Sequence, residues 1–145
     1  MIKIKIPMLI ISLVVVFWGN VSIAQESEHH SGQKNEMFIG VDSPAGKVVM
    51  QFHLALKTGD KTTARKLLAD DILIFEGGRA ERSADEYAHH HMLSDMKYLA
   101  AMKSEPLEHN VKIMGNSAVS MSRSKTVGTY KGKEREYEGM ETIVL

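Results

Sequence analysis

The sequence predicts one α+β domain, with about three helices packed against an antiparallel sheet. Apolar residues recur at helical spacing in the first half of the chain, whereas the segment after Pro106 consists of strand-like stretches separated by tight-turn residues. Helices gathered ahead of a run of strands are typical of α+β domains and not of doubly wound α/β folds. The 145 residues, 43% of them hydrophobic, suffice for one core but not for two.

Residues 1–24 have the pattern of a cleaved secretory signal peptide. Two lysines and no acid precede the apolar run "MLIISLVVVFWG", and the small residues Ser22 and Ala24 predict cleavage after Ala24. The alternative is a membrane anchor, but a spanning helix needs roughly 20 apolar residues. We therefore expect a periplasmic or secreted protein. Because the chain has no cysteine, disulfides and a lipid-modified N-terminus are excluded.

The predicted mature chain is mildly acidic. The full sequence has 18 basic and 18 acidic residues; the signal peptide holds Lys3 and Lys5, which leaves 16 against 18 and a net charge of −2 with histidines neutral. This balance predicts no nucleic-acid partner and no membrane contact after cleavage. Residues 25–40 are polar, include His29 and His30, and are expected to be a flexible lead-in to a domain at 41–145, with folding starting near Met37 or Val41.

Two helices are predicted first. Ser43 and Pro44 form an N-cap and first-turn pair, and apolar spacing then favours a helix over residues 44–57 that stops at "TGD". Asp60 can cap a second, shorter helix through "KTTARKLLAD". A continuous apolar run from Ile72 to Phe75, ended by two glycines, predicts a short buried strand and a turn.

A third helix and a strand hairpin complete the prediction. Ser83 and Glu86 have the capping-box spacing, which favours a helix from about Ala84 to Met96 or beyond. After Pro106, a two-residue turn at Lys131 and Gly132 would pair the strands on either side. The expected register sets Lys125 opposite Glu138, Val119 opposite Val144 and Thr126 opposite Tyr137.

The chain resembles the nuclear-transport-factor-2-like (NTF2-like) superfamily, which includes SnoaL-like cyclases and ketosteroid-isomerase-like proteins. The resemblance is carried by "VVMQFHLALKTGDKTTARKLLADDILIFEGG" and by the closing "GMETIVL". It implies a cone in which a curved sheet wraps a long helix, a pocket at the wide end, and a small apolar or mixed-polarity molecule as partner; dimerisation through the sheet is compatible with it. Such domains usually add a last strand after "ETIVL", so we expect a truncated or shortened cone.

Helical phase separates the three consecutive histidines. On a continuous helix His91 falls on the apolar face, His90 points away from it, and His89 lies on a flank. Asp95 follows His91 by one turn and can accept a hydrogen bond from its ring. His91 and Asp95 are the candidate catalytic pair, as a general base with its orienting carboxylate, and a purely structural ion pair is the alternative.

A metal site is not favoured, because consecutive helix positions diverge by about 100° and cannot converge on one ion. The weak candidates are His89, His91 and Met96, whose donor atoms would suit copper or zinc. Four of the ten methionines, Met50, Met92, Met114 and Met121, lie in apolar patterns and are expected to fill the core. We expect no cofactor, with copper or zinc as the open alternative.

Further candidates border the expected pocket. Candidate ligand-binding residues are Tyr87, His91, Tyr98 and Glu76. A small polar strand face formed by Ser120, Ser122, Ser124 and Thr126 is either exposed to solvent or leaves room for a ligand. Three functions stay open: an exported small-molecule-binding domain, an isomerase, cyclase or hydrolase using His91 and Asp95, and a periplasmic copper- or zinc-binding protein.

Overall fold

The computed structural model of the chain describes residues 36–145. The predicted signal peptide and residues 25–35 of the predicted lead-in lie outside this described part. The elements in chain order are β1 (Phe38–Ile39), α2 (Pro44–Thr58), α3 (Lys61–Lys66), β2 (Ile74–Glu76), β3 (Arg79–Glu81), α4 (Ala84–His89), α5 (Met92–Ala101), β4 (Met102–Met114), β5 (Ser117–Tyr130) and β6 (Lys133–Val144). None of the described helices is long and apolar enough to cross a membrane.

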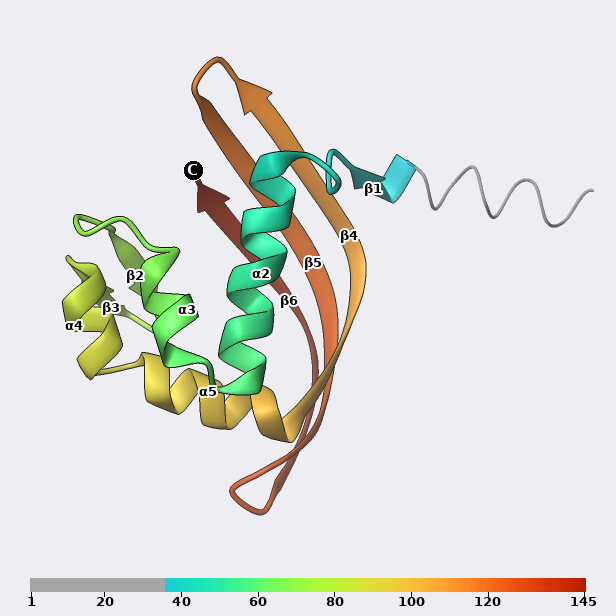
Figure 1. Cartoon of the computed structure of the whole chain (residues 1–145). Helices are drawn as coiled ribbons and strands as arrows, with labels where there is room; N and C mark the ends of the chain where they lie inside the picture. Colours follow the sequence, from blue (N-terminus) through green and yellow to red (C-terminus); the bar gives the residue numbers. More distant parts are fainter. Residues whose placement is uncertain (1–35) are drawn as a thin grey trace, which may run out of the picture.

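The long strands form one curved sheet that bends around α2, with α5 crossing beneath it and the β2–β3 hairpin standing opposite (Figure 1). The strand order is β1-β4-β5-β6, in which β1 is parallel to β4 and the other pairs are antiparallel. The structure is thus an α+β cone, and the predicted fold class is confirmed.

The first two helices begin and end where the sequence predicts. The hydroxyl of Ser43 accepts a hydrogen bond from the Gly46 amide at 3.1 Å, and Pro44 occupies the first turn of α2. Gly59 ends α2 in a left-handed conformation with φ of 77°, which glycine adopts without steric cost. The Asp60 carboxylate then accepts from the Thr63 amide at 3.0 Å and caps α3.

The predicted hairpin register is confirmed. Lys125 lies opposite Glu138, Val119 opposite Val144 and Thr126 opposite Tyr137. The sheet begins earlier than expected, because β4 starts at Met102 and carries Pro106 inside it. The register shifts between Pro106 and Glu108, and such an irregularity accommodates a residue that has no amide hydrogen to donate.

A strand forms near the predicted position at Ile72–Phe75, but the prediction that it is buried is wrong. The strand is Ile74–Glu76, and it pairs only with Arg79–Glu81 in a separate two-stranded hairpin that turns at the two glycines. Phe75 is 75% exposed, whereas Ile74 packs against the core. Because successive side chains on a strand point to opposite faces, a continuous apolar run need not be buried on both.

The predicted third helix is two helices. α4 ends with His90 as its C-cap, and α5 starts after His91, so the break falls inside the histidine run. Neither glycine nor proline occurs there, and the break coincides with a tertiary contact of the His91 ring. Ser83 caps α4 as predicted, because its hydroxyl accepts from the Glu86 amide at 3.1 Å. The Glu86 carboxylate accepts from the Arg82 amide at 2.7 Å and not from the Ser83 amide that a capping box would use.

The core lies mainly among the helices. It contains seven buried residues, and those with the largest side chains are Tyr87, Met92, Met96 and Leu56. Met92 is fully buried, which confirms its predicted core role. The same prediction is wrong for Met50, Met114 and Met121, which are 48%, 49% and 41% exposed because they lie on helix and strand faces turned to solvent. Met96 is 6% exposed and belongs to the core. This core fixes α4 and α5 against α2, and so determines where the residues around the helix break lie.

Candidate carboxylate–histidine site

Two open hollows flank the turn of the β2–β3 hairpin. The first is lined by Phe75, Glu76, Gly77, Gly78, Arg79 and Ala80. The second is lined by Arg79, Ala80, Glu81, Glu86, His90 and His91. The second hollow therefore reaches the helix break and contains the histidine that the sequence singled out.

The central contact of the site joins His91 to Glu81. Nδ1 of His91 lies 2.5 Å from Oε1 of Glu81, and the Glu81 side chain is only 5% exposed whereas that of His91 is 35% exposed. The other oxygen of Glu81, Oε2, is buried and has no hydrogen-bond partner among the described residues. A buried carboxylate oxygen without a donor is costly, so this atom marks a place where a donor is missing.

Asp95 is bonded to Tyr87. The Tyr87 hydroxyl donates to Oδ2 of Asp95 at 2.9 Å. Burial raises the pKa of Asp95, the charge of Glu81 adds to this effect, and the bond from Tyr87 and the charge of His91 oppose it. Burial also raises the pKa of Tyr87, helped by the Asp95 charge. The expected hydrogen bond between the His91 ring and Asp95 is thus absent among the described contacts. His91 is bonded to Glu81, and Asp95 is bonded to Tyr87.

Glu76 completes the group. Burial raises the pKa of its carboxyl, and the charge of Asp95 raises it further. The charge of His91 opposes this rise, and the charges of Glu141 and Glu81 add to it. We call Glu76, Glu81, Tyr87, His91 and Asp95 the carboxylate–histidine site.

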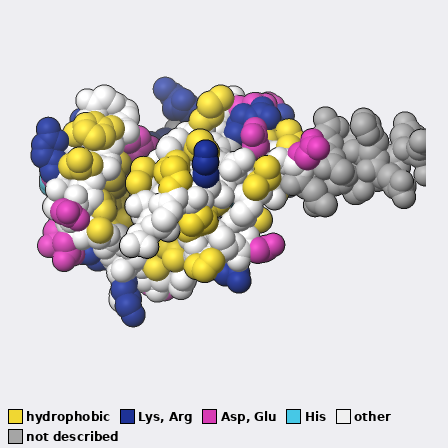
Figure 2. Space-filling model, turned by 90° about the horizontal axis from the view of Figure 1, so that it is seen from above, with side chains coloured by type: hydrophobic (Ala, Val, Ile, Leu, Met, Phe, Trp, Pro, Cys, Tyr) yellow, Lys and Arg dark blue, Asp and Glu magenta, His cyan; other side chains and the backbone are white. Residues whose placement is uncertain are grey.

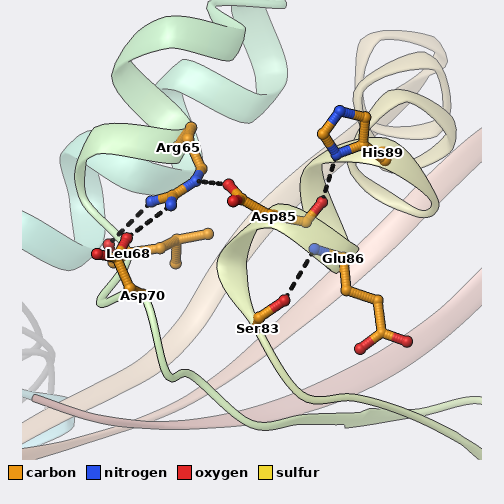
Figure 3. A network of polar contacts seen from close by, with 7 residues as sticks. All are labelled: Arg65, Leu68, Asp70, Ser83, Asp85, Glu86 and His89. Carbon is orange, nitrogen blue, oxygen red and sulfur yellow. Dashed lines mark hydrogen bonds and ion pairs between the residues drawn. The ribbon is translucent and has the colours of Figure 1, made fainter.

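An arginine network holds the start of α4 in place (Figure 3). Arg65 of α3 donates to Asp85 at 2.9 Å and to Asp70 at 2.6 Å, and it also reaches the Leu68 carbonyl. The Asp70 carbonyl in turn accepts from the Ala84 amide at 3.1 Å. These contacts tie α3, the following loop and α4 together, and they set the position of Tyr87.

His89 belongs to this surface network and not to the site. Its Nδ1 lies 2.7 Å from the Asp85 carbonyl oxygen, on the exposed side of α4. Its proposed partner Met96 lies in the helical core. Within residues 36–145, no three histidine, aspartate or glutamate side chains are grouped closely enough to hold a metal ion.

Tyr98 lies away from the carboxylate–histidine site. Its hydroxyl is 2.7 Å from that of Tyr137, and its ring packs edge-on against Tyr130 with centroids 5.0 Å apart. Burial and the bond with Tyr137 raise the pKa of Tyr98 to about 12. Of the four predicted ligand-binding residues, the structure brings Tyr87, His91 and Glu76 together and leaves Tyr98 elsewhere.

Sequence reasoning missed Glu81. The signal was present, because two adjacent glycines favour a tight hairpin, and this turn sets Glu81 opposite Ile74 on the face that meets the core. It was overlooked because the segment after Gly78 was not assigned to a strand.

A second polar group lies on the concave face of the sheet. Nε2 of His109 is 2.8 Å from the Ser120 hydroxyl, and both residues are buried. Burial lowers the pKa of His109, and the nearby charge of His53 adds to this effect. His53 itself contacts Glu141 at 2.9 Å. Ser120 and Thr126 are buried, so at these two positions the polar face of β5 points inward.

The fold and the site define a cone-shaped α+β protein with a polar cluster between its hairpin and its helices. A protein from Shewanella frigidimarina, described as a candidate ketosteroid isomerase, is 51% identical over 74% of this chain and 86% of its own, with a TM-score of 0.73. A candidate dehydratase of the NTF2-like family from Streptomyces avermitilis has 15% identity, covers 69% and 82%, and has a TM-score of 0.58. An NTF2-like superfamily protein from Salmonella enterica serovar Typhimurium has 14% identity, covers 68% and 73%, and has a TM-score of 0.56.

The chain belongs to the NTF2-like superfamily, as the Shewanella relative establishes by its identity and coverage. The two more distant structures support the fold alone. No protein-family model and no curated protein sequence matches the chain.

Proposed function

We propose that this chain binds a small molecule of apolar or mixed polarity at the carboxylate–histidine site. The observation that carries the proposal is the buried carboxylate of Glu81, which holds His91 with one oxygen and leaves the other without a donor. A side chain in this state beside an open hollow is typical of a binding site, because a ligand donor would satisfy it. The signal-like pattern of residues 1–24 supports export to the periplasm or the medium.

A panel of ring compounds tests binding directly. Cyclohexanone, benzyl alcohol, benzylamine and benzoate are each titrated against the protein by calorimetry, and thermal unfolding is followed in parallel. We expect at least one compound to bind and to raise the unfolding temperature. His91→Ala should weaken that binding about tenfold or more, and His89→Ala should not, because His89 is exposed on α4 and lines neither hollow. If no compound binds, or if both variants behave alike, the proposal fails.

Acid–base catalysis is the second candidate, and the Glu81–His91 contact favours it. With Nδ1–H donated to Glu81, Nε2 of His91 carries a free lone pair and can take a proton from a carbon next to a carbonyl. Asp95, with its raised pKa, and Tyr87 could then stabilise the resulting enolate oxygen. Proton abstraction of this kind would serve an isomerisation or a cyclisation. In a hydrolysis, Nε2 of His91 would instead take the proton of the attacking water.

The Shewanella relative adds weight to the isomerisation, since its description names a ketosteroid. The test uses a β,γ-unsaturated ketosteroid, whose conversion to the conjugated enone increases ultraviolet absorbance. We expect turnover that His91→Ala abolishes while the domain stays folded and His89→Ala stays active. Absence of turnover by the wild-type protein would remove this reaction and leave the binding proposal standing.

A further inference from the structure

We infer that the ligand of the carboxylate–histidine site is a small organic cation, a protonated amine on an apolar body. This inference rests on the proposed binding function and names the chemical class of its ligand. Two features of the described residues support it: the balance of charge and the free oxygen of Glu81.

The balance of charge in the site is negative. Glu76, Glu81 and Asp95 come from β2, β3 and α5, and the charges of Asp95 and Glu81 both raise the pKa of Glu76. The carboxylate of Glu141 acts on Glu76 in the same direction and is itself paired with His53. The basic groups facing them are His91, which is bonded to Glu81, and Arg79, which lies opposite Glu76 in the hairpin. Arg79 forms no ion pair within the described part of the chain, although its side chain borders both hollows. The three carboxylates are therefore balanced only by one histidine, which is already bonded to Glu81, and by one arginine without an ion-pair partner among the described residues.

The free oxygen of Glu81 specifies what the ligand must supply. Oε2 is buried, and a carboxylate oxygen accepts hydrogen bonds, so the ligand must bring a donor. An ammonium group has three donors and no acceptor, and its charge-assisted bonds to carboxylates are about twice as strong as neutral ones. A neutral alcohol has one donor, and a carboxylate ligand would be repelled.

The spacing of the carboxylates favours an organic cation over a metal ion. Across residues 36–145, no three acidic or histidine side chains are grouped closely enough to coordinate one ion. Metal–oxygen bonds are about 2.0–2.6 Å long, whereas ammonium–carboxylate contacts of about 2.8 Å and longer still attract. An ammonium ion is thus satisfied by a looser set of carboxylates.

The exposed ring of Phe75 lies on the face of the hairpin opposite Glu76 and Glu81, and it borders the first hollow and not the one that holds Glu81 and His91. It is 75% exposed and lines the same hollow as Glu76. Hydrophobic side chains are also prominent on the upper face of the molecule (Figure 2). The apolar body of an amine bound at Glu81 would meet this ring only if it extended into the hollow around the hairpin turn, which suits an amine attached to a ring or a short alkyl chain.

Protonation provides a second signature. Burial and like charge raise the pKa of Glu76 and of Asp95, so both carboxyls hold their protons to higher pH than usual. A bound cation would favour their ionised forms and lower both pKa values. Binding of an amine near pH 5 should therefore release protons, and binding of a neutral compound should not.

Calorimetry with benzylamine, benzyl alcohol and benzoate tests the inference, because the three probes share a ring and differ in charge. We expect benzylamine to bind about tenfold or more tightly than benzyl alcohol, and benzoate to bind weakest. Titrations near pH 5 in two buffers of different ionisation enthalpy should show proton release with benzylamine alone.

Four variants locate the effect. Glu81→Gln and Glu76→Gln should each weaken benzylamine binding about tenfold while leaving benzyl alcohol binding within about twofold. Glu76→Gln changes an exposed residue at the end of β2, so it stays informative if Glu81→Gln fails to fold. Arg79→Gln should strengthen benzylamine binding by removing a competing cation. Glu134→Gln, which removes the same charge from an exposed position on β6, should change nothing.

Each result decides between the two proposals. If benzyl alcohol or cyclohexanone binds as tightly as benzylamine, the cationic ligand is wrong and the binding function stands. If benzylamine binds but the Glu76 and Glu81 variants bind it equally well, the assignment of the amine to this site is wrong. If no compound in the panel binds, both the inference and the proposed binding function fail.

Discussion

Nδ1 of His91 lies 2.5 Å from Oε1 of Glu81, and this contact joins the cap position of α5 to the last residue of β3. The ring is therefore unavailable to cap α5, which has no side-chain cap hydrogen bond. The same contact orients Nε2, the nitrogen through which His91 would meet a ligand. At this position the His91 side chain makes a tertiary contact with Glu81 in place of a local capping hydrogen bond to α5.

The first prediction concerns the tautomer of His91. In the neutral ring the Glu81 carboxylate should hold the proton on Nδ1, which long-range proton–nitrogen NMR correlations detect directly. Glu81→Ala should release this restriction, while Glu134→Ala leaves the ring signals unchanged. A ring protonated on Nε2 in the neutral wild-type protein would contradict the assigned hydrogen bond.

The second prediction concerns Asp95 and pH. Burial raises the folded-state pKa of Asp95 above its ordinary value of 3.8. Between this value and the raised one, the folded chain therefore binds more protons than the unfolded chain. Stability should therefore fall as pH rises through that window. Asp95→Asn removes the titration but keeps an oxygen for Tyr87, so its stability relative to wild type should increase with pH. Urea unfolding at several pH values measures this, and a parallel pH profile for the two proteins would refute it.

The third prediction concerns the hydroxyl of Tyr87, a residue that is 3% exposed and donates to Asp95. Tyr87→Phe leaves the ring in the core but removes the donor from a partly buried carboxylate. We expect a loss of about 1–3 kcal/mol in unfolding free energy at neutral pH and a further rise in the pKa of Asp95. The loss should shrink in the Asp95→Asn background; an equal loss in both backgrounds would show that the two side chains are not coupled.

The fourth prediction tests the core. Met92 is fully buried beneath the helix break, and Met92→Ala should cost about 2–5 kcal/mol through lost contacts and the cavity left behind. Met140 is 84% exposed on β6, so Met140→Ala should change stability by less than about 0.5 kcal/mol. Chemical denaturation of both variants provides the comparison, and similar losses would mean that the buried position of Met92 is wrong.

Short-range sequence signals predicted much of the fold. Ser43, Gly59, Asp60 and Ser83 act through neighbours three or four residues away, and each ends or begins a helix as its residue type indicates. The β5–β6 register followed from a two-residue turn and from side-chain pairs on both faces of the strands. In both cases the deciding contacts lie close in the chain or repeat regularly along it.

The sequence predicted the site less well because its contacts are tertiary. No glycine or proline signals the helix break at His90 and His91. A prediction that assumed one continuous helix therefore paired His91 with Asp95. In the structure Glu81, ten residues earlier, is bonded to His91, and Tyr87 is bonded to Asp95. Nothing in the sequence separated Tyr98 from Tyr87, but in the structure the hydroxyl of Tyr98 contacts that of Tyr137 on β6. Which carboxylate meets which ring was set by hairpin and helix packing.

Amide NMR mapping of benzylamine on the isotopically labelled protein tests the central claim most directly. If the carboxylate–histidine site is the binding site, the largest shift changes should fall on residues 75–81 and 87–95, and Glu81→Gln should reduce them together. Changes centred on the outer face of β5 and β6, or no changes at millimolar benzylamine, would contradict the assignment of this site.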